Sequence, residues 1–304
     1  MAIVGGCAVK RRVVVSVLTF VILVGLVPLA MAPAAAQMVA WDCPTQSEPG
    51  MATPARSATH VAGFPLAGGE LTVFAAASLT DAFEAIESDL EAANPDLSIT
   101  YNFGGSQALV TQLKEGAEAD VFTSANVAQM DVAKEAGLIA DEATTFVRNR
   151  LAIVTPVDNP ARIEGAADLG TEGLRLVLAQ PEVPAGRYAR ESVCTMGIHV
   201  GTYGARFTER VAANVVSEEE DVRDVLAKVT LGEADAGIVY VSDATAAGDQ
   251  VHVVDIPDDV NIVATYPIAP LAGGDEVLAS AFIAYLLSDG GQGTLASFGF
   301  EPVA

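Results

Sequence analysis

From Glu70 onward, short apolar segments alternate with amphipathic ones, and this alternation constrains the fold more than any other feature of the chain. The segments that we expect to form strands are 71–76, 98–103, 119–125, 151–156, 174–180 and 236–241. Amphipathic helical patterns separate them, and strands that alternate with helices are typical of largely parallel sheets. The sequence therefore predicts an α/β protein.

The helical patterns also predict which residues are buried. The helix after 71–76 places five apolar side chains on one face, namely Leu79, Ala82, Phe83, Ile86 and Leu90. The helix after 98–103 would turn Leu109, Val110 and Leu113 inward and end at Gly116. Further helices are expected from near Ala185, from near Asp221, at 276–287 and at 292–298. This helical tail after the strand-rich segment 261–270 indicates that the chain crosses back to its first half.

The length of 304 residues, of which 51% are hydrophobic, allows one large core or two medium ones, and we expect two lobes. The predicted organisation is a signal peptide at 1–36, an extended leader at 37–69, lobe I at 70–147 plus 267–304, and lobe II at 148–266. Two crossing strands would act as the hinge. The leader contains four prolines and no sustained helical or strand period.

The first 36 residues have the pattern of an export signal. Lys10, Arg11 and Arg12 precede an apolar run from Val13 to Met31, and small residues follow up to Ala36. The alternative is a retained membrane anchor, because the run is close to the length that spans a bilayer. A lipoprotein is disfavoured, because Cys43 follows Trp41 and Asp42 instead of small apolar residues.

The charge excludes one class of partner and poses a question for another. Removing residues 1–36 takes three of the 16 basic residues and none of the 39 acidic ones, so the net charge changes from −23 to −26. Nucleic acid is excluded as a partner, because its phosphates require clustered Lys and Arg. An anion could be held only by local dipoles that outweigh the global field.

Two cysteines, Cys43 and Cys194, remain after processing. In an exported protein such a pair predicts a disulfide, which would tie the leader to the body of the protein. Two separate thiols are the alternative.

Two serines follow predicted strands directly and precede helices. Ser78 comes after 71–76, and Ser106 comes after 98–103 and Gly104–Gly105. Ligands of open α/β sheets bind beyond the carboxyl ends of the strands, and the first N–H groups of a helix are free to hold an anion. The alternative is plain N-capping, because "SLTD" resembles a capping box in which Asp81 is the third residue.

Three further positions in the second half fit the same chemistry. Pro184 predicts a helix start that leaves the N–H of Ala185 uncovered, and Tyr240 ends a strand with a hydroxyl that could donate. Val222 would donate its N–H if its helix began near Asp221, whereas a capping box of Ser217 and Glu220 would place it inside the helix.

Six segments, in this order and at these separations, resemble the periplasmic molybdate-binding component of ABC importers. They are "TVFAAASLTDAF", "FGGSQALVTQL", "ADVFTSAN", "PEVPAGRYA", "EEDVRDVLAKV" and "GIVYVSDA", and the resemblance runs from about residue 70 to the C-terminus. It implies a two-lobed periplasmic-binding-protein fold (type II-like) with a mostly parallel sheet flanked by helices in each lobe. The ligand would lie in the cleft between the lobes.

The resemblance also implies the ligand set and the function. The oxyanion would be held by the hydroxyls of Ser78, Ser106 and Tyr240 and by the N–H groups of Ala185 and Val222, so that the molybdenum is reached only through its oxygens. The protein would capture molybdate, and tungstate as well, and deliver it to a membrane permease. It would be an exported monomer on the periplasmic or cell-surface side of the membrane, with no cofactor and no catalysis. The leader and the Cys43/Cys194 pair are not part of the family pattern.

Chemistry supports a fully deprotonated anion. Molybdate, tungstate and sulfate need donors only, whereas phosphate benefits from a carboxylate that accepts its remaining proton, and none of the five positions is a carboxylate. Sulfate therefore stays an alternative, because it differs from molybdate mainly in size.

A serine hydrolase is the alternative from another class. "GGSQA" places Ser106 in a pattern close to a nucleophile elbow, and His199 or His252 could complete a triad. Against it, Ala108 stands where the elbow needs its second glycine. A ferric-ion carrier would need clustered tyrosines, but Tyr188 and Tyr203 lie in or near the helical region after Ala185. The effector-sensing domain of a transcription regulator is disfavoured by the export signal.

Overall fold

The computed structural model describes residues 41, 43 and 68–303. The predicted signal peptide and nearly all of the predicted leader lie outside these residues. Within the described part of the chain, no helix has the length and apolar character that crossing a membrane requires.

Ten strands are described. Their bounds are β1 Gly69–Ala76, β2 Leu97–Gly104, β3 Val121–Thr123, β4 Thr144–Pro156, β5 Leu176–Ala179, β6 Val215–Glu219, β7 Ala236–Tyr240, β8 Val251–Asp255, β9 Val263–Pro270 and β10 Glu301–Pro302.

The helices lie between these strands and after them. Their bounds are α1 Thr80–Ala93, α2 Ser106–Lys114, α3 Val127–Glu135, α4 Pro184–Ile198, α5 Val200–Tyr203, α6 Phe207–Asn214, α7 Val222–Thr230, α8 Val241–Ala247, α9 Glu276–Leu286 and α10 Asp289–Ser297, with short 3₁₀ turns η1 Ala77–Leu79, η2 Ala166–Gly170 and η3 Gly248–Gln250.

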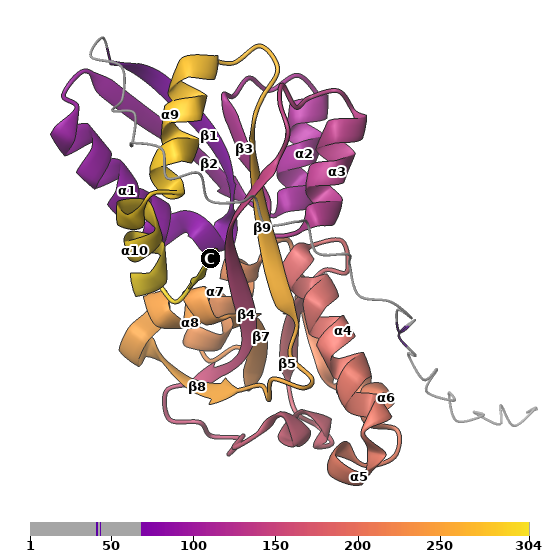
Figure 1. The fold of residues 1–304 in the computed structure, drawn as a ribbon. Helices are drawn as coiled ribbons and strands as arrows, with labels where there is room; N and C mark the ends of the chain where they lie inside the picture. The colour runs from indigo at the N-terminus through magenta and orange to yellow at the C-terminus, as the bar shows by residue number, and fades with distance from the viewer. Residues whose placement is uncertain (1–40, 42, 44–67, 304) are drawn as a thin grey trace, which may run out of the picture. The chain divides into compact units, whose positions relative to one another are not determined.

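The strands form one continuous hydrogen-bonded path in the order β2-β1-β3-β9-β4-β7-β5-β6, with β8 and β10 also paired to β4. The pairs β1–β2, β1–β3, β5–β6 and β5–β7 are parallel, whereas β9 and β4 join the two parallel groups through antiparallel pairs. The long strand β4 pairs with β9 over its first part and with β7 and β8 over its second part. It therefore passes from one group of strands to the other (Figure 1).

The first group of strands has helices on both faces, and successive side chains of β1 point to opposite faces. Leu71, Val73 and Ala75 of β1 belong to the core that includes the α1 residues Phe83 and Ile86, whereas Phe74 packs with α2 and α3. Helices α1, α9 and α10 lie on one face, and α2 and α3 lie on the other (Figure 1).

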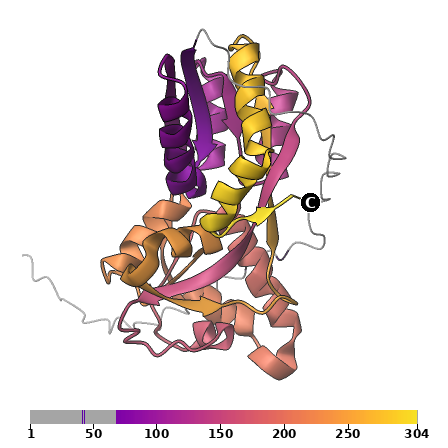
Figure 2. The same cartoon turned by 60° about the vertical axis from the view of Figure 1, so that its left-hand side comes forward.

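The C-terminal helices return to this first group, as the sequence predicts. The rings of Phe83 in α1 and Phe282 in α9 meet edge to face with centroids 5.7 Å apart. Figure 2 shows the yellow C-terminal helices beside the first strands and β10 returning to the middle of the molecule. We keep the names lobe I (70–147 and 267–304) and lobe II (148–266) for the two parts, and this exact division stays a prediction.

The predicted strands and helices correspond to described elements, and their ends differ by at most about three residues except in β4. This strand begins at Thr144, seven residues before the predicted 151–156. Two segments behave differently from a local pattern. "SLTD" does not start a capped helix at Ser78, because η1 comes first and α1 begins at Thr80 after Leu79. Ser217 lies in β6 and not at a helix start. Both differences matter for the site.

Candidate anion-binding site

One small pocket lies between the two lobes and contains all five residues predicted from the sequence. The empty space within it, including the solvent at its mouth, is about 210 Å³. Its lining residues are Ala76, Ala77, Ser78, Gly104, Gly105, Ser106, Ala125, Val183, Pro184, Ala185, Asp221, Val222 and Tyr240. The structure thus brings Ser78, Ser106, Ala185, Val222 and Tyr240 together around one pocket.

The two serines reach the pocket from the ends of neighbouring parallel strands. Ser78 follows β1 and Ser106 follows β2, and the side chains are 3% and 1% exposed. Neither hydroxyl caps a helix. The Ser78 Oγ lies 2.8 Å from the Tyr266 hydroxyl, and the Ser106 Oγ accepts a hydrogen bond from the Ala125 N–H at 3.0 Å. The capping alternative therefore does not describe either serine.

The loop before Ser106 lies close to lobe II. A Cβ atom on Gly105 would lie 2.6 Å from the carbonyl oxygen of Glu220, and Gln107 donates from its Nε2 to the same oxygen at 2.9 Å. Glycine at 105 thus lets the two lobes approach each other beside the pocket, a role that the sequence suggested only for approach to a ligand.

Two helix N-termini of lobe II lie at the pocket. Helix α4 begins at Pro184, so Ala185 is its second residue, and α7 begins at Val222. The first N–H groups of a helix have no acceptor within it, and the helix dipole makes this end positive. Asp221 caps α7 by accepting from the N–H groups of Arg223 and Asp224 at 2.7 and 3.1 Å. The predicted helix start near Asp221 is therefore confirmed over the one at Ser217, and the N–H of Val222 is not used by this cap.

Tyr240 completes the set at the end of β7. Its side chain is 1% exposed, and its hydroxyl has no hydrogen-bond partner among the described residues. Burial raises the pKa of Tyr240 above its ordinary value, so the phenol keeps its proton. An unpaired buried hydroxyl is unfavourable unless a ligand accepts its proton.

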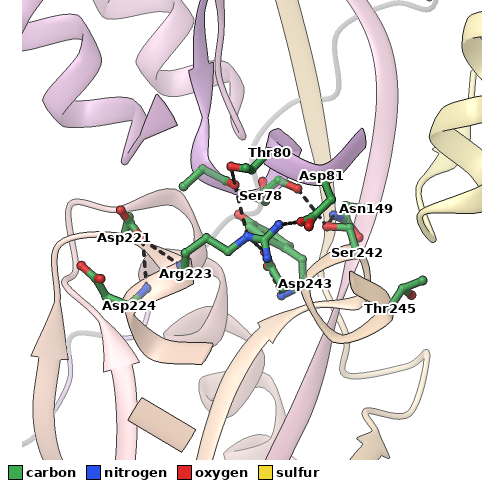
Figure 3. A network of polar contacts seen from close by, with 12 residues as sticks. Ser78, Thr80, Asp81, Asn149, Asp221, Arg223, Asp224, Ser242, Asp243 and Thr245 are labelled. Carbon is green, nitrogen blue, oxygen red and sulfur yellow. Dashed lines mark hydrogen bonds and ion pairs between the residues drawn. The ribbon is translucent and has the colours of Figure 1, made fainter. Parts of the chain in front are cut away.

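A network of charges lies beside the pocket and joins three helices. Arg223 in α7 forms ion pairs with Asp81 in α1 and with Asp243 in α8, the latter at 3.0 Å, and its Nε donates to the Ala77 carbonyl at 3.3 Å. Figure 3 shows the Arg223 side chain extending between these two carboxylates, with Ser78 nearby. Lobe II thus contacts lobe I at Ala77, the residue before Ser78.

Asp243 is a fully buried carboxylate within this network. Burial raises the pKa of Asp243 to about 6, although Arg223 and the N–H of Tyr240, which donates at 3.1 Å, both favour the ionised form. At neutral pH the carboxylate is therefore mainly ionised. It holds the end of β7 from which the Tyr240 ring projects.

The structure does not support the other chemistries. His199 and His252 are exposed, and neither lines the pocket that contains Ser106, so no triad forms there. Tyr188 and Tyr203 do not line it either. In the described residues there is no cluster of His, Cys, Asp and Glu that could hold a metal ion.

Three residues around the site were not predicted from the sequence. Tyr266 on β9 contacts Ser78, and Asn149 on β4 contacts Tyr266. Arg223 forms an ion pair that bridges the lobes. Tyr266 is 188 residues from Ser78 along the chain. No local pattern contains such a contact, although Tyr266 does lie in the segment 261–270 that the sequence marks as strand-rich.

The two cysteines are joined in the structure. Cys43 and Cys194 form a disulfide with their Cα atoms 5.5 Å apart, and this attaches residue 43 to α4. The guanidinium of Arg190, one turn earlier in α4, lies 5.3 Å from the centroid of the Trp41 ring. Since the Cys43 sulfur is bonded to Cys194, it is not available for a lipid.

Comparison with known proteins gives a consistent result. Residues 71–301 match the family model described as "Bacterial extracellular solute-binding protein". The molybdate-binding protein ModA of Mycobacterium tuberculosis is 41% identical over 244 residues, which cover 80% of this chain and 88% of that protein.

Solved structures agree with the sequence comparison. The substrate-binding domain of a molybdenum ABC transporter from Clostridium difficile aligns with a TM-score of 0.58 at 32% identity, covering 77% of this chain and 99% of that one. The sulfate-binding protein SubI from Mycobacterium tuberculosis aligns with a TM-score of 0.69 at 18% identity, covering 77% and 87%. The predicted α/β periplasmic-binding-protein fold is confirmed.

Proposed function

Because the chain belongs to the family of bacterial extracellular solute-binding proteins, we propose that it captures molybdate outside the cytoplasm and delivers it to an ABC importer. The family match confirms the predicted location outside the cytoplasm and the prediction that the chain is not an enzyme. Tungstate, which has the same charge and shape, is proposed as a second ligand, and a membrane permease is proposed as the partner of a monomeric protein.

The observation that carries the proposal is the convergence of five donors on one small pocket. The hydroxyls of Ser78, Ser106 and Tyr240 and the helix N-termini at Ala185 and Val222 supply donors from both lobes. Charge-assisted hydrogen bonds stabilise an anion by roughly 1.5–3 kcal/mol each, so several of them can offset its dehydration. This explains how a chain with a net charge of −23 could hold a dianion.

The only carboxylate that lines this pocket within the described residues is Asp221. Its Oδ1 already accepts two backbone N–H groups at the start of α7. We therefore expect it to support the helix terminus and not to receive a proton from the ligand. This favours molybdate, tungstate or sulfate over hydrogen phosphate.

Sulfate is the second candidate, because it needs the same donors and the fold is shared with a sulfate-binding protein. The two anions differ in size, and a rigid ring of donors selects the anion for which all hydrogen bonds reach good length together. The relatives favour molybdate, because the molybdate-binding protein ModA and the domain of the molybdenum transporter are more similar to this chain in sequence than the sulfate-binding protein is.

A thermal-shift panel on the chain from residue 37 tests the proposal. A ligand that binds only the folded state raises the Tm, and at 100 times the Kd it stabilises by about 2.7 kcal/mol. Molybdate and tungstate should each raise the Tm, whereas phosphate and ferric citrate should leave it unchanged. A shift with sulfate alone would transfer the proposal to sulfate, and no shift with any of these oxyanions would refute it.

A further inference from the structure

A chain of buried polar side chains lies behind Ser78 and leads to the strands that join the lobes. Ser78 contacts the Tyr266 hydroxyl of β9 at 2.8 Å, and the Asn149 Nδ2 of β4 reaches that hydroxyl at 3.5 Å. The same Nδ2 donates to Ser242 Oγ at 2.8 Å, and Ser242 in turn donates to the Ser78 carbonyl at 3.4 Å. All four side chains are at most 3% exposed.

Asn149 fixes one donor in this chain. Its Oδ1 accepts from the N–H of Arg150 at 2.9 Å, which assigns the Nδ2 group to the side of Tyr266 and Ser242. An amide nitrogen can only donate, so the Tyr266 oxygen accepts from it. Burial raises the pKa of Tyr266, so the phenol keeps its proton and can donate that proton to Ser78.

We propose that Tyr266, oriented by Asn149, is a positioning residue that determines which anions the pocket accepts, by donating to Ser78 and turning the serine's single proton toward the ligand. The inference rests on the proposed function. A serine hydroxyl has one proton, and an oxygen that accepts from Tyr266 presents that proton elsewhere.

The second serine is supplied in the same way by a different group. The Ala125 N–H donates to Ser106 Oγ at 3.0 Å, which leaves the Ser106 proton for the pocket that both residues line. The Tyr240 hydroxyl is buried without a partner among the described residues. All three hydroxyls then turn their protons toward the pocket, which favours an anion that needs only donors over one that carries its own proton.

The opposite polarity of this hydrogen bond, with Ser78 donating to Tyr266, gives a different expectation. If Ser78 donated to Tyr266, its lone pairs would face the pocket and could accept the proton of hydrogen phosphate. The two polarities thus predict opposite selectivity, and replacing Tyr266 separates them.

Tyr266→Phe is the decisive variant, studied by isothermal titration calorimetry with sodium molybdate and with inorganic phosphate at pH 7.5. Without the Tyr266 donor, Ser78 can rotate and accept a proton. We expect the molybdate affinity to fall about tenfold, while phosphate affinity is unchanged or higher, so that the ratio of the two affinities falls at least tenfold. Asn149→Ala should shift the ratio in the same direction by less.

Matched controls separate positioning from folding. Tyr101→Phe also removes a mostly buried tyrosine hydroxyl in lobe I, one that donates to the Phe83 carbonyl at 3.1 Å, and should leave the ratio unchanged. Ser78→Ala should weaken molybdate without strengthening phosphate, because it removes the hydroxyl altogether. Thermal melts of all variants check that they fold. If Tyr266→Phe does not fold, the affinity ratio of Asn149→Ala provides the test.

Two outcomes would overturn the inference. One is a molybdate-to-phosphate ratio in Tyr266→Phe within twofold of the unchanged protein, which an equal loss of both affinities would also give. The other is a rise in the ratio, which would show that Ser78 donates to Tyr266. A failure of the unchanged protein to bind molybdate would instead refute the proposed function, so the two failures are distinguishable.

Discussion

At the scale of single residues, the proposed site depends on hydroxyl groups whose protons would be free for a ligand. Ser106 shows the principle: its oxygen accepts from the Ala125 main chain, and its side chain is 1% exposed. A buried proton without an acceptor is unfavourable, which makes the hydroxyl a ready donor to an anion. Local dipoles can thus overcome the repulsion from an acidic surface.

Ser106→Ala should therefore weaken molybdate binding by at least tenfold. Loss of one hydrogen bond to a charged group corresponds to about 1.5–3 kcal/mol, and about 1.4 kcal/mol is a tenfold change in affinity. Isothermal titration calorimetry measures the change directly. Ser192→Ala is the matched control, since Ser192 is as deeply buried but bonds to the Val260 carbonyl away from the pocket. Equal affinities of Ser106→Ala and the unchanged protein would remove Ser106 from the site.

At the scale of elements, the sequence was informative where strands end and helices begin. The apolar strands and amphipathic helices placed Ser78, Ser106, Ala185, Val222 and Tyr240 at such ends, and all five line one pocket. The residue types at these ends, together with the resemblance, were enough to propose the donors. What each donor contacts from behind could not be derived in this way.

Local capping patterns failed where tertiary contacts were stronger. Ser78 fits a capping box, but its hydroxyl bonds to Tyr266 instead. Ser217 also fits one, but it lies in β6, where it accepts from Lys228 and donates to Glu219. The contacts with Tyr266 and Lys228 join residues of different elements, and a short pattern contains no information about them. The same reason explains why Arg223 and Asn149 were missed.

The contact between α7 and α1 predicts a modest effect on release of the ligand. Asp81→Asn breaks the ion pair that joins Arg223 to lobe I and leaves the Arg223–Asp243 pair in place. Partly exposed pairs contribute about 0.2–1 kcal/mol, so molybdate affinity should fall no more than about fivefold, through faster dissociation.

Stopped-flow measurement of molybdate dissociation checks this expectation at low and high salt. The difference between Asp81→Asn and the unchanged protein should shrink as salt is added, because salt screens exposed charges. Asp89→Asn, on an exposed position of the same helix, is the control. An unchanged dissociation rate in Asp81→Asn would show that this ion pair does not hold the lobes together around the ligand.

At the scale of the whole molecule, strand β4 and the antiparallel strand β9 connect the two groups of parallel strands, and the polar side chains behind Ser78 are attached to both. Pocket and connection are therefore in direct contact through Tyr266 and Asn149. We propose that the lobes close around a ligand, and this movement would change the contacts of these two residues first. The disulfide adds a covalent link from residue 43 to α4 of lobe II, while the chain enters lobe I at Gly69.

The disulfide should stabilise the fold without changing the site. Cys43 and Cys194 are 151 residues apart, and the chain-entropy model gives about 5 kcal/mol for a closed loop of that size. Cys43→Ala combined with Cys194→Ala should therefore lower the denaturant midpoint clearly, while molybdate affinity stays within twofold, because neither cysteine lines the pocket.

Guanidinium unfolding of the two proteins, each with and without a reducing agent, measures the difference. The reducing agent should act only on the unchanged protein, and the fluorescence of Trp41, the single tryptophan, should report release from Arg190. Equal midpoints for the two proteins would mean that the link to α4 does not stabilise the folded chain.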